Sequence, residues 1–506
     1  MPQHRTDLNR RQFFTRSALA AGAGALGGGV FDALVARAAF ASDPRGRGQS
    51  GGYGPLRAAG EDLALPEGFQ YRVIANEGDP MDDGFPTPKA MDGMATFPLP
   101  NGNILLVRNQ EDGQAGNTLR PRPTGSTSTS AGILNDRLGT HYGPRAFAYD
   151  EFAAGGTTTI EVEPHGQRRL VSQHWSLVGT VRNCAGGATP WGSWLSCEET
   201  LENGSATGYA QNHGYIFEVP IDTAPGIPTP PVALKHMGRF AHEAVAVDPA
   251  SGIVYETEDQ GDGSGFYRYV PAAKPTQPGD LAAPTGQLQM LKVKGMPQYE
   301  TAINQTIGTA LPVEWVNITN PDPTPVSVVV SGVTLSAVFV EGLAAGGARF
   351  RRLEGCWYGN GRIFFISTNG GNMGFGQVWE YNISDDTITL IAESTSHDMF
   401  DGPDNVCVSP HGGLVFCEDA TAAQFLRGVA PTGEVFPLAR NLRNSIEFAG
   451  ACFSPDGETL FANLYGRGNE RTTQPYRSAV QIPVGPERFE RAATVAIWGP
   501  WRSGPL

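Results

Sequence analysis

Polar residues that could bind a cation recur in one sequence context along this chain. In each copy, a turn glycine is followed by a short apolar or β-forming run, which ends in carboxylates or carboxamides. The six clusters contain Asn109 and Glu111; Glu198 and Glu199; Glu258 and Asp259; Asn369; Glu418 and Asp419; and Asn463. Their oxygen atoms are ligands for calcium and other hard cations.

A second polar group precedes each turn glycine. These groups are Asp92, Cys184, Glu243, Glu354, Asn405 and Glu447. If all copies meet at one place, their like charges require neutralising cations. The thiol of Cys184 among oxygen ligands indicates a second metal that is softer or more highly charged, such as iron or zinc. A zinc finger is excluded, because the chain has no CxxC and no HExxH motif.

The elements that must hold these groups are β-hairpins. An apolar strand and a tight turn separate the two groups of each copy, as in the turn Ser454-Pro455-Asp456-Gly457. Six hairpins predict an all-β fold, a six-bladed β-propeller whose equivalent positions face one another across an axial channel. Longer intervals require loop insertions, at 224–231, 271–286 and 287–347. Two stacked β-sandwiches are the alternative, but they would not explain why every copy ends alike.

Composition supports this fold class. The chain has 506 residues with 65 Gly and 39 Pro, well above the average usage of about 7% and 5%. Such frequent turn residues exclude a long helical bundle or coiled coil, while 40% hydrophobic residues suffice for a folded core. The formal net charge of −14 argues against nucleic acid as a partner.

The N-terminus has the features of an export signal. Asn9-Arg10-Arg11-Gln12-Phe13-Phe14 is a twin-arginine pair followed by aromatics, and Ala39-Phe40-Ala41 fits a signal peptidase site. A weakly apolar run rich in Ala and Gly lies between them. We therefore predict a twin-arginine signal at 1–41, a flexible linker at 42–60, a single propeller domain at 61–506, and a periplasmic or secreted location.

The six cysteines divide into two kinds. Five of them lie in apolar runs, where Cys is most simply a small core residue: Cys197, Cys356, Cys407, Cys417 and Cys452. Their spacing does not form a disulfide framework. Cys184 differs, because it lies in a polar turn between Asn183 and Ala185-Gly186-Gly187, and this context favours a role in the site.

Several of these motifs resemble the PhoX-type alkaline phosphatases. The similar segments are Arg182-Asn183-Cys184-Ala185-Gly186-Gly187, Trp194, Cys197-Glu198-Glu199, Gly238-Arg239-Phe240-Ala241-His242-Glu243, Arg352-Leu353-Glu354-Gly355, and Asp401-Gly402-Pro403-Asp404-Asn405-Val406. The resemblance extends through essentially the whole chain after the signal. It implies a six-bladed propeller with ferric iron (Fe3+) and calcium (Ca2+) in the axial channel, and phosphate monoesters as substrates.

The resemblance also implies roles for single residues. Cys184 would be an iron ligand with one or both of Glu198 and Glu199, while Glu243 and Glu354 would hold iron or calcium. Arg352 would bind the phosphate. Further channel positions, assigned mainly by aligning the repeats, are Asn109, Glu111, Asp404, Asn405, Glu418 and Asp419. Gln110 stands where a His is expected in typical members, and this chain is shorter than the best-known ones.

Three other functions share parts of this pattern. A calcium-dependent propeller lactonase would use the oxygen ligands without Cys184 or iron. A propeller phytase would use calcium alone on an inositol polyphosphate. A non-catalytic binding module would keep the scaffold only. The metals bound by the protein separate these functions from the phosphatase, and the oligomeric state stays open.

The export signal yields the first prediction. Replacing both Arg10→Lys and Arg11→Lys removes the paired guanidinium groups that twin-arginine transport reads. We expect the precursor of this double variant to stay in the cytoplasm of a bacterial host, as measured by immunoblots of fractionated cells. An unchanged periplasmic yield would contradict twin-arginine export.

Overall fold

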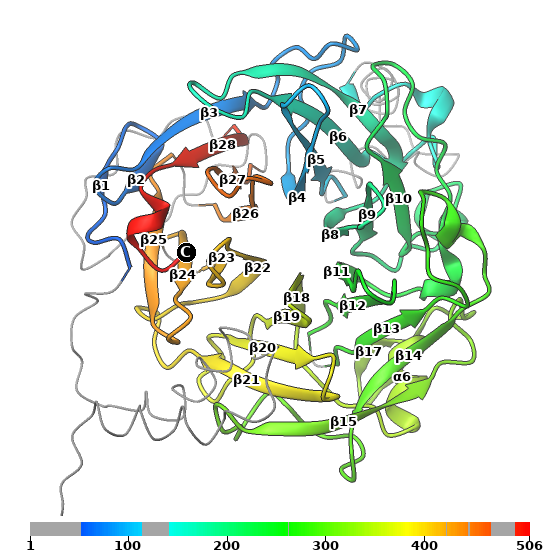
Figure 1. Ribbon diagram of the computed structural model, residues 1–506. Helices are drawn as coiled ribbons and strands as arrows, with labels where there is room; N and C mark the ends of the chain where they lie inside the picture. Colours follow the sequence, from blue (N-terminus) through cyan, green and yellow to red (C-terminus); the bar gives the residue numbers. More distant parts are fainter. Residues whose placement is uncertain (1–51, 114–140, 262, 421–422, 444–445, 467–490) are drawn as a thin grey trace, which may run out of the picture.

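The computed structural model describes residues 52–113, 141–261, 263–420, 423–443, 446–466 and 491–506. The predicted export signal lies outside these residues. Within them the chain is all-β, and its sheets are arranged around a central axis (Figure 1). This propeller-like arrangement confirms the predicted fold class over the stacked sandwiches. No helix in the described ranges has the length and apolar character needed to span a bilayer.

The strands follow one another in antiparallel runs that start at the axis and proceed outwards. The runs are β4–β7 (Met91–Pro98, Ile104–Gln110, Gly155–Val162, Leu170–Thr180); β8–β10 (Asn183–Ala188, Ser193–Glu198, Ile216–Pro220); β11–β15 (His242–Val247, Val254–Glu258, Phe266–Val270, Gln287–Val293, Ala310–Asn317); β18–β21 (Leu353–Gly359, Arg362–Ser367, Gln377–Asn382, Thr387–Glu393); β22–β25 (Pro403–Val408, Leu414–Glu418, Phe425–Val429, Val435–Asn441); and β26–β28 (Phe448–Phe453, Leu460–Leu464, Ala493–Trp498). Figure 1 shows the first strand of each run, from β4 to β26, nearest the centre.

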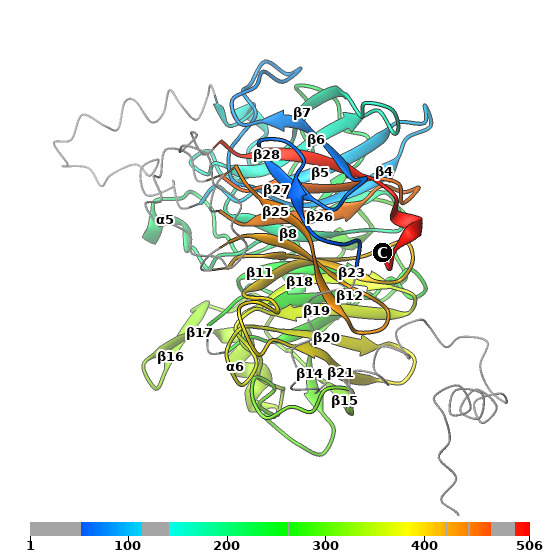
Figure 2. The same cartoon turned by 90° about the vertical axis from the view of Figure 1, so that its left-hand side faces the viewer.

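The strand pairing does not separate these runs into six independent sheets. The sheets contain six, three, nine, two, four and four strands, because β15 pairs with both β14 and β21 and joins two runs into one. The insertion predicted at 287–347 is responsible, since it contains β15, the small hairpin β16–β17 (Ser327–Val330, Val333–Ser336) and helix α6 (Ala337–Ala344). Among the described residues, the second α-helix is the short α5 (Gly204–Thr207). The hairpin and both helices project on one side of the ring in Figure 2.

The ends of the chain close the ring. Strand β3 (Gln70–Asn76) pairs with β28, so the last sheet combines N-terminal and C-terminal segments. Strands β1 (Arg57–Ala58) and β2 (Leu63–Leu65) extend the neighbouring sheet beyond β25. The Tyr53 ring packs edge-on against Phe69 and Trp501. Within the predicted linker at 42–60, Tyr53 thus contacts the domain, while most of residues 54–60 are exposed.

The hydrophobic core lies between adjacent sheets. Strands of successive runs pack face to face, as where Phe266 of β13 stacks on Phe365 of β19 with ring centroids 4.3 Å apart. The strands are consequently apolar on both faces over much of their length, and all six cysteines are buried free thiols. The expectation that the cysteines form no disulfide framework is thus confirmed.

One structural repeat positions the polar groups. In all six inner hairpins the register of the first strand shifts near its start, which is the mark of a β-bulge; the shift follows the first pair in five of them and the second pair in β26–β27. In all six, the residue after the second strand donates its backbone N–H to the carbonyl of the residue before the first pair, at 2.8 to 3.1 Å. A bulge turns a side chain out of the normal alternation, and here it turns side chains toward the axis.

Neighbouring bulges approach one another so closely that some positions require glycine. A Cβ added at Gly355 would lie 2.6 Å from the backbone nitrogen of Val406, and one added at Gly93 would lie 2.5 Å from the Cα of Ala185. Both neighbours are backbone atoms that cannot move aside singly. The small residues therefore set how narrow the channel is.

We expect Gly355→Ala to destabilise the protein by about 1–3 kcal/mol, the usual cost of overpacking a core. Gly261→Ala is the control, since a Cβ there meets nothing within 4 Å. Denaturant unfolding of the two variants should show a lower midpoint for Gly355→Ala alone. Equal midpoints would show that the inner strands can move apart to accommodate a Cβ at position 355 without loss of unfolding free energy.

Candidate metal centre

The bulges bring five potential ligands from five hairpins to the axis. Three groups of ligand atoms lie within 4.8 Å of one another: Asp92, Glu111 and Cys184; Cys184, Glu199 and Glu243; and Glu243, Glu354 and Asp404. Because neighbouring groups share a member, they form one continuous arrangement, which we call the acidic arc. Asp92, Cys184, Glu243, Glu354 and Asp404 each follow the first pair of their hairpin directly. Glu111 and Glu199 come from the ends of the second strands.

The negatively charged forms of the groups in the acidic arc are strongly disfavoured. Burial raises the pKa of Asp92, Glu243 and Glu354 well above the usual carboxyl range, and the neighbouring acids raise it further. Burial and Asp419 together raise the pKa of Asp404 to about 8. Burial also raises the pKa of the Cys184 thiol, whose sulfur lies 3.4 Å from Asp92 Oδ2. Without cations, protons must neutralise these groups, and a bound cation would displace them.

Two arginines occupy equivalent places beside the acidic arc. Arg182 and Arg352 each precede the first pair of their hairpin, and each has a left-handed backbone, with φ of 50° and 41°. Arg182 Nη2 lies 3.1 Å from Glu111 and 2.7 Å from Glu199.

The second arginine bridges carboxylates in the same way. Arg352 Nη2 lies 3.0 Å from Asp259 and 2.6 Å from Glu354, and its side chain is 38% exposed. Its guanidinium is thereby fixed in orientation while part of it still faces solvent. A partly exposed cation held beside buried acids is suited to binding an anion.

The donors of the acidic arc fit metal cations. Both carboxylate oxygens of Glu243 are buried without a hydrogen-bond partner among the described residues, although such atoms are nearly always satisfied in folded proteins. Glu243 belongs to two of the three ligand groups, so its oxygens face the thiol of Cys184 on one side and Glu354 with Asp404 on the other. One sulfur among many oxygens can hold hard cations together with a softer or more highly charged one.

Three predicted ligands point away from the axis. Glu198 accepts hydrogen bonds from the backbone N–H of Val181 and Gly214, and its Oε1 lies 2.7 Å from His213 Nδ1. Glu418 binds Arg427, at 2.8 Å. Asn109 accepts hydrogen bonds from the Trp194 indole and the Ser196 hydroxyl. The structure therefore places Glu198, Glu418 and Asn109 outside the acidic arc.

Strand alternation explains these placements. Glu198 and Glu418 are the last residues of β9 and β23, and consecutive residues of a strand point to opposite faces. When Glu199 faces the axis, Glu198 must face the interior of its own sheet. Although burial lowers it, Glu198 and Asp150 raise the pKa of His213 to about 9. Gln110 occupies the same strand-end place in β5, away from the axis.

Asn405 and Asp419 lie next to the acidic arc without belonging to its three groups. Asn405 donates to Asp404 Oδ1 at 2.8 Å and accepts from the backbone N–H of Gly450, so it orients the Asp404 carboxylate. Asp419 is exposed, at the end of the equivalent hairpin. The repeat in the sequence aligns Asn405 with Cys184. The pairing register instead shows that Asp404 is the residue equivalent to Cys184.

The sequence reasoning left several site residues out of its ligand set. Asp92 and Glu447 appeared in the repeat but were not chosen as ligands, and the signal that could have selected them was their position in it. Asp259 binds Arg352, and Arg182 lies in a similar position to Arg352. The buried Tyr465 donates to Glu111 Oε2 at 2.6 Å. No sequence pattern singled out this tyrosine.

Comparison with known proteins decides the family. The family model described as "Alkaline phosphatase PhoX" matches residues 51–468, which is most of the chain. The chain belongs to the alkaline phosphatase PhoX family. The motifs around Cys184, Glu243 and Arg352, on which the resemblance rested, lie within the matched residues. No curated protein sequence matches the chain.

A solved PhoX structure shares the fold. Pseudomonas fluorescens PhoX in complex with vanadate, a transition state analogue, is 18% identical, with a TM-score of 0.62, and the match covers 90% of this chain and 99% of that chain. A gluconolactonase from Xanthomonas campestris is 8% identical, with a TM-score of 0.37 over 90% of this chain and 100% of that one. The second similarity is too low to support any argument about function.

The orientation of the two adjacent glutamates gives a sharp prediction. We expect Glu199→Gln to reduce the metal content of the purified protein, because an amide is a weaker ligand than a carboxylate. Glu198→Gln should keep its metal but lose about 1–3 kcal/mol of stability, since the charge-assisted hydrogen bond between Glu198 and His213 is lost. Elemental analysis and thermal melting measure the two effects. Metal loss from Glu198→Gln but not from Glu199→Gln would show that Glu198, and not Glu199, is the metal ligand.

Proposed function

We propose that this protein is a metal-dependent phosphatase that hydrolyses phosphate monoesters at the acidic arc, with ferric iron and calcium as its metals. The observation that carries the proposal is the convergence of Cys184 with Glu199 and Glu243 on the axis of a protein of the PhoX family. A calcium-only lactonase or phytase would have no use for this buried thiol.

The donor types suggest how the metals are distributed. Cys184, shared by two ligand groups, is the soft donor for iron, with Glu199 and Glu243 beside it. Glu354 and Asp404 supply only oxygen atoms, which suits calcium. When bound, these cations would neutralise the oxygens of the phosphoryl group and acidify the attacking water.

The chain's own residues bind and orient the ester. Arg352 donates N–H groups to the phosphoryl oxygens, and Asp259 with Glu354 hold its guanidinium in place at 3.0 and 2.6 Å. Arg182, fixed by Glu111 and Glu199, keeps those two carboxylates turned toward the axis. Asn405 holds Asp404 in the same way. Each acid is therefore oriented before the substrate arrives, which lowers the reorganisation needed during reaction.

We propose further that the fold has six blades in one domain and that the protein is exported. Six inner hairpins with the same bulge and backbone hydrogen bond support six blades, as does the packing of Phe266 against Phe365 between the two halves of the nine-stranded sheet. The twin-arginine motif at Arg10 and Arg11 supports export to the periplasm or the medium. The small phosphate ester is the expected partner.

Cys184 provides the test of the proposed function. We expect Cys184→Ser to keep the fold, lose bound iron and lose activity on an aryl phosphate by orders of magnitude, because the thiolate donor is removed. The matched control is Cys452→Ser, which changes a fully buried core cysteine of β26. The control should lose stability but keep its iron.

Elemental analysis of the natively exported protein, followed by the phosphatase assay, measures both outcomes. Iron and calcium together with activity support the proposal. If both variants retained iron and near-normal turnover, the iron assignment would be wrong, and calcium as the sole metal would favour the lactonase or phytase.

A further inference from the structure

The axial channel continues beyond the acidic arc, and its next layer is almost closed. The second residues of the bulges surround a cavity of about 20 Å³ there, which is room for about one water molecule. The lining includes Gly93, Ala185, Ala244, Gly355 and Asn405. Small residues line this layer because the inner strands approach at backbone distance, as the contacts of Gly355 show.

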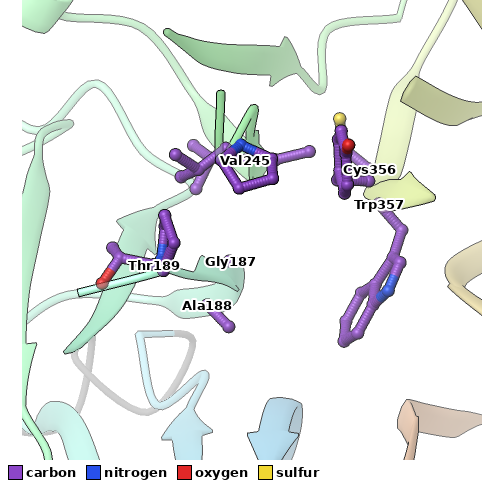
Figure 3. Close-up of a pocket in the computed structure, with 11 residues that line it drawn as sticks. Gly187, Ala188, Thr189, Val245, Cys356 and Trp357 are labelled. Carbon is purple, nitrogen blue, oxygen red and sulfur yellow. The ribbon is translucent and has the colours of Figure 1, made fainter. Parts of the chain in front are cut away.

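A large side chain, that of Trp357, closes the far end of this cavity; the other indole in the lining, that of Trp194, donates to Asn109. Trp357 lies on β18, three residues after Glu354, and it lines the small cavity together with residues from the inner strands of all the runs. It packs against four hydrophobic clusters, which include Met94 of β4, Val406 of β22 and Ala451 of β26. A side chain of β18 reaches clusters on facing sheets only by lying across the axis. Figure 3 shows the indole extending from β18 into the space encircled by the sheets.

A second, larger cavity lies on the other side of the indole. It has a volume of about 250 Å³ and is bounded by the ends of β8, β11 and β18 and by the turns that follow β8 and β11. These turns are at the opposite end of the inner strands from the bulges. Cys356 and Trp357 line both cavities (Figure 3). The indole is therefore the partition between the metal centre and the turn side of the ring.

We propose that Trp357 is a plug that gives the metal centre one opening. Ions, ester and phosphate would pass only on the side where Arg182, Arg352 and Asp419 reach solvent. The carbon face of the Trp357 indole offers no ligand to a cation, so cations would not leave through the channel toward the turns. By excluding water that would enter from the turn side of the ring, the indole also strengthens the electrostatic interactions of the buried acids. This role rests on the cation centre of the proposed function but not on its phosphatase activity.

Metal release tests the plug directly. The metal-loaded enzyme is mixed with excess chelator, and the first-order release of calcium and iron is followed. In Trp357→Ala the two cavities would join, and we expect release faster by about tenfold or more than in the wild type. Trp357→Phe, which keeps a smaller ring, should release at an intermediate rate and guards against misfolding of the alanine variant.

Two controls separate a plug from a general loss of stability. Trp191→Ala removes a partly buried indole that binds Glu218 at the rim of the ring, and it should release metal at the wild-type rate. Added indole should slow release from Trp357→Ala by refilling the space, because apolar cavities bind aromatic molecules of matching size. A structural defect would not respond to indole.

The outcomes decide between the two proposals. Equal release rates for the wild type and a folded Trp357→Ala, at unchanged metal content, would overturn the plug and leave the phosphatase intact. Faster release that indole does not slow would also overturn it. A wild-type protein that binds no metal would overturn both the plug and the proposed function.

Discussion

The mutual repulsion of buried carboxylates on the propeller axis is the constraint on which the rest of this structure depends. Asp92, Glu243 and Glu354, all buried, and the half-buried Asp404 come from four different hairpins and meet with Cys184. Bringing such groups together costs free energy that only opposite charge offsets. Two arginines supply part of that charge at the rim, and the orphaned oxygens of Glu243 mark where more is required.

The scaffold that offsets this cost repeats one structural feature, a bulged hairpin at the inner edge of each run. A bulge near the start of each inner hairpin, which in five of them turns one side chain toward the axis, is accompanied by the same backbone hydrogen bond at that level. Glycines at the bulges allow the inner strands to approach at backbone distance. The pairing of β3 with β28 then joins the chain ends, so that repulsion at the centre is resisted by a closed ring.

The same geometry separates the roles of neighbouring acids. Glu198, Glu258 and Glu418 close the second strands of their hairpins and accept hydrogen bonds within their own sheets. The residues that follow them, Glu199 and Asp259, reach the level of the arginines. One acid of each pair thus stabilises the blade and the other serves the site, and Trp357 closes the layer below.

The sequence alone determined the fold class, the family and most members of the acidic arc. Short apolar runs between turn glycines indicated hairpins, and the recurrence of Asp92, Cys184, Glu243 and Glu354 at matching points indicated that they meet. Cys184 was recognisable because its neighbours in sequence are polar or small rather than apolar, although the structure places it in strand β8 and not in a turn. These inferences depend on local pattern, which the sequence carries in full.

Only the tertiary structure decided which of two adjacent polar residues faces the axis. Glu199 rather than Glu198, and Asp404 rather than Asn405, follow from where each bulge shifts the register, and bulges leave no mark in the residue types. The merging of two runs through β15 and the packing of Tyr53 on Trp501 likewise join segments far apart in sequence. Side-chain direction and long-range contact are set by pairing partners, and a single strand does not specify its partner.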